Sequence, residues 1–329
     1  MSHIHWLYPF QPNTFQDVHN ANLASIRLRL GAFIAALPSN HELNIGPLAT
    51  SKSDILIIGK LGAKGAQEFG QNWIRQMQGL RSRGTKVVLD YTDDHLTYLS
   101  ELTPFYQEAL LHIDLAVCSS PLLAINLSRS YTGPIEVIPD AIEVPLISTK
   151  LSLQSETTAL WFGHLTNLQF LIDFLPNLAT SRPLRLIVLS NIEALQRIKA
   201  NPYEIPDNVQ TMCAIWSASS MLEAARISDF CIIPSERGNS RKAAVSSNRL
   251  LTALALGLPT AADRMDSYLE FSDYFTDIRS PDFHKLLENP LAFTSKIGQI
   301  QGIIANKYSL EKIGMKWMQL MHRLVGSNI

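Results

Sequence analysis

The sequence predicts an α/β protein with two domains in tandem, each built on a parallel sheet that helices cover on both faces. Short apolar runs rich in β-branched residues alternate with longer segments of helical period, which is typical of such sheets. The alternation occurs in two series, and a stretch rich in Ser, Thr and Pro separates them. The chain of 329 residues, 46% of them hydrophobic, is long enough for two domains of ordinary size.

The first domain is expected over residues 1–145. Its segment 54–58 is almost wholly apolar, as in a strand that is buried on both faces of a sheet. Residues 143–158 show no helical stripe and are predicted to form the linker. The strands of this domain are expected at residues 3–8, 54–58, 86–90, 114–118 and 136–138.

The second domain is expected over residues 146–308. The run Ser220-Met221-Leu222-Glu223 has the pattern of a capping box and predicts that a helix starts there. A helix from about residue 246 to 256 should end at Gly257. Ser309 should open a last amphipathic helix within residues 309–329. The strands of this domain are expected at residues 159–162, 184–189, 208–212, 229–233, 259–261 and 275–278.

Composition limits the classes of partner and compartment. The chain has 28 Lys and Arg against 29 Asp and Glu, a net charge of −1, so it lacks the basic field of a general nucleic-acid binder. Its three widely spaced cysteines lie in apolar runs and indicate buried thiols in a reducing compartment. The start of the chain lacks a signal-peptide pattern, and the longest apolar run, 250–262, is shorter than the roughly 20 residues that cross a bilayer. We therefore expect a soluble cytoplasmic protein.

One segment, residues 232–260, predicts a site for an anion. A buried strand is followed by a loop carrying Arg237, Arg241 and Lys242, and then by a helix whose first turn follows Ser246. A helix start offers free N–H groups and a positive dipole end, and neighbouring cations favour a phosphate or diphosphate there. The alternative is that Ser246 only caps the helix and the basic side chains are solvated.

This segment resembles the donor-binding part of GT-B glycosyltransferases of the family-4-like type, most specifically over residues 246–259. Residues 159–164, 137–143 and 117–120 are similar to further parts of that family, in the same order along the chain. The resemblance implies two Rossmann-like domains facing across a cleft. It also implies a nucleotide-sugar donor in the C-terminal domain, an acceptor in the N-terminal domain, and a last helix that crosses back to the first domain.

Residue roles follow from the resemblance at matching positions. The usual arginine after the glycine turn is His164 here, and the two usual glutamates correspond to Ala244 and Thr252, neither of which is acidic. Thr252 could hydrogen-bond a ribose, and Glu236 could stand in for the acid that faces the sugar. The resemblance implies no metal or other cofactor. The implied donor site consists of Gly163, His164, Lys242, Ser246, Ser247, Asn248, Arg249 and Thr252.

The first domain offers candidate acid–base groups after the strand at 86–90. Asp93, Asp94 or His95 could contact the donor sugar or an acceptor hydroxyl and accept a proton there. Capping of the next helix by Asp93 or Asp94 is the alternative. The spacing of these acids with Asp90 does not fit a metal-binding Asp-x-Asp pair, so we expect no metal.

Two arginines near the N-terminus are further candidates for a side chain that faces the cleft. Arg27 and Arg29 are expected on different faces of an amphipathic helix, so at most one can face the cleft. We expect that arginine to be solvated rather than paired.

Together these patterns predict a glycosyltransferase that moves a sugar from a nucleotide-sugar to a glycan or lipid-linked acceptor, in bacterial surface-polysaccharide synthesis. A lipid-linked acceptor would bring it to a membrane surface as a peripheral protein, and nucleic acid is not expected among its partners. The alternative is a non-catalytic binding or scaffold protein of the same fold, which the missing glutamates at Ala244 and Thr252 favour.

Overall fold

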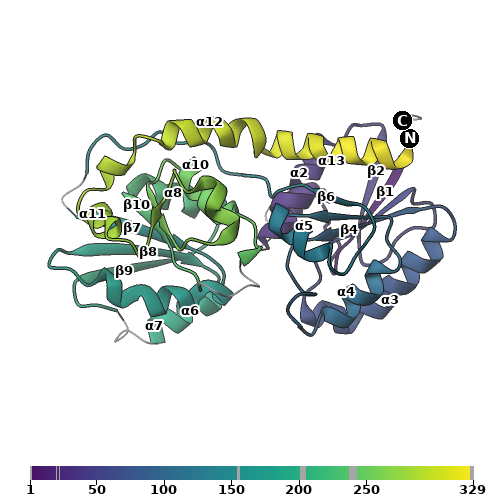
Figure 1. Cartoon of the computed structure of the whole chain (residues 1–329), viewed down its shortest axis with the longest axis horizontal. Coiled ribbons are helices and arrows are strands. Elements are labelled where there is room, and N and C mark those ends of the chain that lie inside the picture. The colour runs from purple at the N-terminus through teal and green to yellow at the C-terminus, as the bar shows by residue number, and fades with distance from the viewer. Residues whose placement is uncertain are drawn as a thin grey trace. The chain divides into compact units, whose positions relative to one another are not determined.

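The computed structural model describes residues 2–19, 21, 23–153, 156–200, 205–236 and 243–326. Its contacts divide the chain into two compact units (Figure 1). Unit 1 comprises Met1–Ala141, Ala243–Ser246 and Lys307–Ile329, and unit 2 comprises Ile142–Lys242 and Ser247–Asn306. Each unit contains a six-stranded sheet in which all the neighbouring strands are parallel, so the predicted α/β class is confirmed.

The sheet of unit 1 has the strand order β2-β1-β3-β4-β5-β6. Five of these strands coincide with the predicted ones. The edge strand β2 was not predicted, because its residues are mostly half-exposed and show no apolar run. The strands are β1 (Ser2–Leu7), β2 (His41–Gly46), β3 (Ile55–Ile58), β4 (Lys86–Tyr91), β5 (Leu115–Cys118) and β6 (Ile135–Val137).

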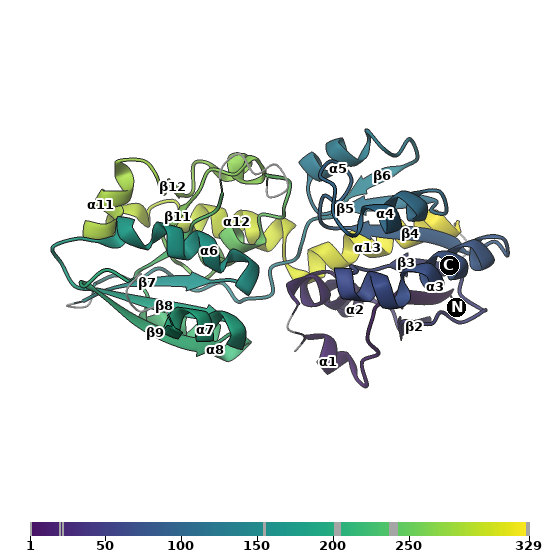
Figure 2. The same cartoon turned by 90° about the horizontal axis from the view of Figure 1, so that it is seen from below.

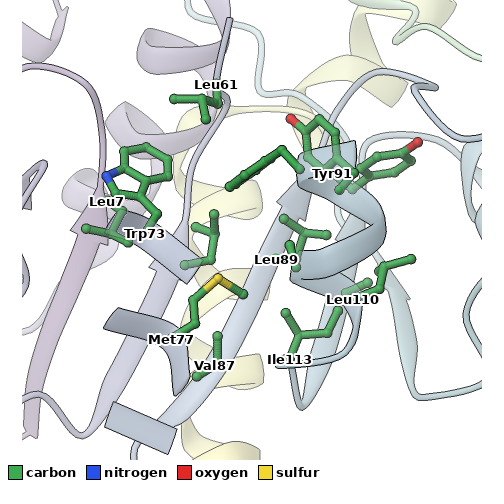
Figure 3. Packing of buried hydrophobic residues seen from close by; sticks show 14 of the residues in the cluster. Leu7, Leu61, Trp73, Met77, Val87, Leu89, Tyr91, Leu110 and Ile113 are labelled. Atoms are coloured by element: carbon green, nitrogen blue, oxygen red, sulfur yellow. The ribbon is translucent and has the colours of Figure 1, made fainter. Parts of the chain in front are cut away.

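Two apolar clusters hold the helices of unit 1. One includes Trp73 and Met77 of α3 with Leu89 of β4 (Figure 3). The other includes Trp6 of β1, whose ring lies 5.2 Å from that of Trp317 in α13. The helices are α1 (Phe15–His19), the π-helix η1 (Ile26–Leu30), α2 (Gly31–Ala36), α3 (Ala63–Arg81), α4 (Thr103–Leu110), α5 (Pro121–Leu127) and α13 (Leu310–Val325).

The last helix, α13, packs on α2 within unit 1. The Ser309 hydroxyl accepts a hydrogen bond from the Lys312 N–H at 3.3 Å, which confirms the predicted cap. A Cβ atom at Gly314 would lie 2.3 Å from the carbonyl oxygen of Ala32, so only glycine permits this close approach. None of the helices in the described part of the chain is long and apolar enough to cross a membrane.

The sheet of unit 2 has the strand order β12-β11-β10-β7-β8-β9. All six strands lie within two or three residues of the predicted positions. Their nearly continuous burial in β7, β8 and β10 explains why the sequence shows apolar runs rather than alternation. The strands are β7 (Thr157–Phe162), β8 (Leu184–Ser190), β9 (Val209–Ile215), β10 (Phe230–Ile233), β11 (Thr260–Ala262) and β12 (Thr276–Asp277).

The helices of unit 2 cover the apolar cluster around Trp161 and Ile232. Figure 1 shows α6 and α7 on one side of the sheet and α8 and α10 on the other, and in Figure 2 β12 and β9 lie at opposite edges of the sheet. The α-helices are α6 (Leu165–Phe174), α7 (Ile192–Ala200), α8 (Ala218–Ile227), α10 (Asn248–Ala255), α11 (Asp282–Glu288) and α12 (Ile297–Lys307). The short 3-10 helices are η2 (Leu175–Leu178), η4 (Asp266–Phe271) and η5 (Pro290–Phe293).

Two predicted helix ends need comment. The capping box predicted at Ser220 and Glu223 is wrong: it lies one turn earlier, between Ser217 and Ser220. The Ser217 hydroxyl accepts from the Ser220 N–H at 3.0 Å, and the Ser220 hydroxyl accepts from the Ser217 N–H at 2.8 Å. A serine at the third helical position therefore replaces the expected glutamate. The predicted stop at Gly257 is confirmed by its φ of +76°.

Candidate functional site

Each sheet has one place where the strand order reverses, and this is where ligands bind in open α/β sheets. In unit 2 the chain runs from β7 to β8 and β9 on one side, and then returns to β10 beside β7. The loops after β7 and β10 therefore leave in opposite directions. They contain Gly163 and His164 after β7, and Pro234, Ser235 and Glu236 after β10.

Arg249, in the first turn of α10, lies at this reversal point. Its Nε and Nη2 atoms donate to the carbonyl oxygen of Phe162, the last residue of β7, at 3.0 and 2.7 Å. Its guanidinium carbon lies 5.6 Å from the ring centroid of Trp161. The side chain is thus anchored to the carboxyl end of the central strand by hydrogen bonds and a cation–π contact.

The positive charge of Arg249 has no carboxylate partner in the described part of unit 2. Burial lowers the pKa of its half-buried side chain, against an opposing effect of the nearby Tyr268 and Cys231. Burial therefore disfavours the charged form, and the described carboxylates do not offset this cost. The ion pairs described in unit 2 are Lys150–Asp229, Arg185–Glu156, Arg279–Asp263 and Lys285–Asp282.

Gly163 lies directly against this arginine. A Cβ atom there would meet the Trp161 ring at 3.0 Å and the Arg249 Nη2 atom at 3.3 Å, so the absence of a side chain leaves room beside the guanidinium. The Gly163 carbonyl accepts from the Ser190 hydroxyl at the end of β8, at 2.6 Å. The structure therefore brings the predicted Gly163 and Arg249 together.

His164 and the start of α6 are occupied by local hydrogen bonds. The His164 Nδ1 atom accepts from the Thr166 N–H at 3.4 Å, and the Asn191 Oδ1 atom accepts from the Leu165 N–H at 2.9 Å. The first amides of α6 are thus capped by side chains of unit 2. Arg249 supplies a guanidinium at this edge, whereas position 164 holds a histidine.

The other predicted donor residues lie on or near the start of α10. The helix begins at Asn248, and its cap residue, Ser247, makes no side-chain capping bond. Thr252 follows Asn248 by four positions and Arg249 by three, which places it on the same side of the helix as both. Ser246 belongs to unit 1 by its contacts, Glu236 is exposed, and Lys242 lies outside the described residues.

Ala244, at one of the positions where the resembling family has a glutamate, is buried. It is 1% exposed and packs in the apolar cluster of unit 1 that contains Trp73. Its carbonyl oxygen accepts from the Ser120 hydroxyl at 2.8 Å. A carboxylate at this position would be buried among apolar side chains.

One buried acid at the edge of the second sheet was missed from the sequence. Asp263, which follows β11 and is fully buried, accepts from the Ser235 N–H at 2.8 Å and from the Arg279 Nε atom at 2.8 Å. It thereby holds the loop after β10 to the loop after β12. The only feature of the sequence that could have indicated this role of Asp263 is its position directly after a short strand.

In unit 1 the strand order reverses between β1 and β3, so the loops after these strands flank the corresponding point. Tyr8 follows β1 and Lys60 follows β3. Lys60 forms an ion pair with Asp93, in which both side chains are about one-third exposed. Nearby Asp93 raises the pKa of Lys60 against the opposing effect of burial, which is the largest influence on this ammonium.

A buried ionic network lies behind this pair. The Arg29 Nε atom donates to Asp90 Oδ1 and Oδ2 at 2.7 and 2.9 Å, and its Nη1 atom donates to the Ile138 carbonyl at 2.8 Å and to Asp140 at 3.2 Å. Arg29 is 0% exposed. The expectation of a solvated arginine is therefore wrong: the π-helix η1 directs Arg29 into unit 1, and Arg27 is buried as well.

Of the three candidate acid–base residues of unit 1, Asp93 pairs with Lys60, and Asp94 and His95 are also held by neighbours. The Asp94 carboxylate is 2% exposed and accepts from the N–H groups of Leu96 and Thr97 at 3.3 and 2.9 Å, and from Asn126 Nδ2 at 2.9 Å. These bonds shape its own loop. The half-buried His95 stacks on the Tyr106 ring at 5.0 Å, and its Nδ1 atom lies 3.0 Å from the Ser100 hydroxyl oxygen.

Within the described residues, no group of three or more His, Cys, Asp and Glu side chains has the arrangement of a metal site. Cys118 and Cys231 are buried free thiols, and burial raises the pKa of each to about 12. Neither is poised to act as a thiolate at neutral pH.

Several of the similar solved structures are glycosyltransferases, and another is a putative UDP-N-acetylglucosamine 2-epimerase from Listeria monocytogenes. An α-glucosyltransferase (AGT) in complex with UDP matches with a TM-score of 0.65 at 12% identity, over 99% of this chain and 100% of that one. A glycosyltransferase from Rickettsia africae ESF-5 matches with a TM-score of 0.61 at 12% identity, over the full length of both chains. TarM matches with a TM-score of 0.54 at 12% identity, over 82% of this chain, which spans only 55% of the length of TarM.

These likenesses and the two parallel sheets establish the fold as that of the GT-B glycosyltransferases. No protein-family model and no curated protein sequence matches the chain. One of the similar AGT structures contains UDP-glucose and DNA with an abasic site.

Proposed function

We propose that the protein is a glycosyltransferase that moves a sugar from a nucleotide-sugar donor to a glycan or lipid-linked acceptor. The observation that carries the proposal is Arg249: a half-buried cation at the reversal point of the second sheet, anchored on Phe162 and without a carboxylate partner in the described part of unit 2. The presence of UDP or UDP-glucose in similar AGT structures supports a nucleotide-sugar as the donor.

A diphosphate fits this arginine for two reasons. Its guanidinium can offer further N–H groups beside Gly163, and hydrogen bonds between charged groups are about twice as strong as neutral ones. Sugar transfer also leaves negative charge on the departing nucleoside diphosphate. A fixed cation therefore stabilises the transition state more than the bound donor.

The remaining residues take proposed roles around that group. Ser246, Ser247, Asn248 and Lys242 contribute further donors to the diphosphate, and Thr252 hydrogen-bonds the ribose. His95 and Glu236 are the candidates for contact with the sugar or acceptor, whereas the three bonds of Asp94 favour the capping alternative. In this site, side chains of the protein neutralise the negative charge of the diphosphate, and no metal is needed.

We propose a glycan or lipid-linked acceptor in bacterial surface-polysaccharide synthesis, with peripheral attachment to the membrane in the lipid-linked case. The buried free thiols agree with a reducing cytoplasm. Balanced charge argues against nucleic acid, but a similar AGT structure contains DNA, so duplex DNA belongs in any panel of acceptors.

A non-catalytic binding protein is the second candidate. The buried Ala244 and the uncharged Thr252 favour it, because neither supplies a carboxylate. This candidate differs from the first in lacking turnover, not in the anion site.

Calorimetric titration with UDP, GDP and ADP and their glucose conjugates tests the anion site first. We expect micromolar to millimolar binding of at least one of these, weakened about 10–100-fold in Arg249→Ala. Arg226→Ala is the matched control, since it removes an exposed arginine from the last turn of α8 and should leave binding unchanged. Slow hydrolysis of the bound donor would favour the enzyme over the non-catalytic protein, and no nucleotide binding at all would refute the proposal.

A further inference from the structure

Strand β9 forms one edge of the sheet of unit 2 (Figure 2), and in the described part of the chain it pairs only with β8. It is seven residues long, and its sequence, Val-Gln-Thr-Met-Cys-Ala-Ile, contains no charged residue and no proline. The side chains of Met212 and Ile215 are 45% and 59% exposed. A long, uncharged and partly apolar edge strand is a template that pairs readily with a further strand.

The other sheet edges are protected in the ways that are usual for edge strands, by shortness or by charge. β12 has only two residues, and one of them is Asp277. β6 has three residues, and its Glu136 forms an ion pair with Arg323. β2 is six residues long but carries Glu42, whose side chain is 52% exposed. Among the edges of the two described sheets only β9 lacks both kinds of protection, which indicates that another strand covers it.

The pairing of β9 with β8 shows which of its backbone groups face the open edge. At the start of the strand, the Leu184 N–H donates to the Asn208 carbonyl at 2.9 Å. Just after its end, the Trp216 N–H donates to the Ser190 carbonyl at 2.9 Å. The bonds of a parallel ladder use alternate residues of each strand, so the even-numbered residues of β9 bond to β8. The residues whose backbone groups point outward are Val209, Thr211, Cys213 and Ile215.

Two of these outward groups are satisfied within the chain. The Val209 N–H donates to the Pro206 carbonyl at 2.8 Å. The Ile215 carbonyl accepts from the Ser220 hydroxyl at 2.9 Å. The outward groups that have no partner in the described structure are the Val209 carbonyl, both backbone groups of Thr211 and Cys213, and the Ile215 N–H.

An antiparallel second copy of β9 satisfies all of these open groups in one register. When Met212 lies opposite Met212 of the second copy, Thr211 lies opposite Cys213, and the two residues exchange N–H···O bonds. Ile215 then lies opposite Val209, and its N–H reaches the Val209 carbonyl of the second copy. The Val209 N–H and the Ile215 carbonyl would face each other in this register, and these are the two groups that already have partners. The pattern of open groups is therefore self-complementary about a two-fold axis at Met212.

We propose that β9 pairs with β9 of a second copy of this chain, antiparallel about a two-fold axis at Met212, and so joins two sheets into one. Because the strand carries no charge, the pairing brings no like charges together. The exposed Met212 side chains meet at the axis, and the exposed Ile215 meets Val209 of the second copy. This pairing does not depend on Arg249 or on the proposed transferase activity.

The expected dimer is reversible. Specific and stable interfaces bury about 1,200–2,000 Å², and an interface of one strand from each copy belongs at the small end of this class. We therefore expect a dissociation constant of about 1–100 µM. Analytical ultracentrifugation of the full chain from about 1 to 500 µM should show a monomer–dimer equilibrium.

Two variants test the strand. Thr211→Pro removes an outward N–H that makes no bond within the described chain, and edge strands tolerate proline at such positions. Met212→Lys places two like charges at the axis. Each should weaken dimerisation at least about tenfold. Val137→Lys, on the edge strand β6 of the other sheet, is the matched control and should leave the dimer unchanged. Urea unfolding at about 1 µM, where the monomer dominates, shows that each variant is folded.

Cross-linking tests the register. Met212→Cys places two thiols on directly opposite residues, whose Cα atoms would be about 4.5 Å apart, within the range that a disulfide spans. We expect a disulfide-linked dimer after mild oxidation, identified by peptide mass mapping. Gln210→Cys is the control: Gln210 is exposed on the same face, but it would lie opposite Ala214 of the second copy, so the two new thiols would be far apart.

A monomer at every concentration would overturn the proposal and leave the β9 edge to a strand of a different protein. A dimer that neither Thr211→Pro nor Met212→Lys weakens would overturn it as well, because that dimer would use another surface. Cross-linking of Gln210→Cys without cross-linking of Met212→Cys would refute the register. Since UDP binding is measured separately, loss of the dimer and loss of the anion site are distinguishable results.

Discussion

The reversal points of the two sheets have the same topology but opposite charge. In unit 1 the carboxylates of Asp90, Asp93 and Asp140 outnumber the cations of Arg29 and Lys60. In unit 2 Arg249 contacts a carbonyl oxygen and aromatic rings, and no described carboxylate neutralises it. One architecture thus supports two chemistries, since the charge at each reversal point is set by individual side chains of strands, helices and loops, whereas the topology sets only where these side chains meet.

The largest expected effect is the loss of stability that follows replacement of Arg29, the buried cation of unit 1. Arg29→Met leaves Asp90 and Asp140 without their buried partner, so we expect a loss of about 3–5 kcal/mol in the free energy of unfolding. Urea denaturation followed by far-UV circular dichroism measures it. Arg323→Met, which breaks an exposed pair with Glu136, should cost at most about 1 kcal/mol. Equal costs for the two variants would show that the buried Arg29 network stabilises unit 1 no more than an exposed ion pair does.

Arg249→Met should have the reverse pattern. Burial disfavours the charge of its side chain, so an apolar replacement of similar length should leave the midpoint of urea unfolding unchanged or raise it slightly. UDP binding should weaken about 10–100-fold, as measured by calorimetry. A large loss of stability with intact UDP binding would mean that Arg249 is structural.

Gly163→Ala tests how closely the anion site is built. The new methyl group would lie 3.0 Å from the Trp161 ring and 3.3 Å from Arg249 Nη2, which requires a small shift of the guanidinium. We expect UDP binding to weaken by about threefold to tenfold, with little change in unfolding. The same affinity as the unsubstituted protein would show that the ligand does not approach the backbone there.

The smallest expected effect is a pH dependence that belongs to unit 1. Burial, and then the neighbouring His322, lowers the pKa of His41, and burial lowers the pKa of His5. Because the unfolded chain binds protons at a higher pH than the folded one, stability should be complete above the ordinary histidine pKa of about 6.5 and fall as the pH drops below it. Hydrogen exchange by mass spectrometry at pH 7 and pH 5.5 would locate the loss, and His41→Gln should reduce it. An equal loss in that variant would exclude His41 as a source.

Particular residues show how far the sequence could be interpreted. The apolar runs of β3, β7 and β10 were predicted because buried parallel strands leave a local signal, whereas β2 was missed because a half-exposed edge strand leaves none. The helix stop at Gly257 was predicted because glycine readily adopts the left-handed conformation, and its φ of +76° confirms the prediction. The prediction that Arg29 is solvated was wrong, because the sequence around an arginine in a helical segment does not indicate that distant residues pair with it. Its partners are Asp90 and Asp140.

The amino-acid sequence alone determined the α/β class, the two sheets and most strand positions, since burial periodicity and turn chemistry act between near neighbours. Tertiary structure alone decided that Arg29 is buried between two carboxylates, that Ala244 packs into the core of unit 1, and that Arg249 lies on the end of β7 beside Gly163. These outcomes depend on contacts between residues tens of positions apart, and only the folded chain brings such residues together.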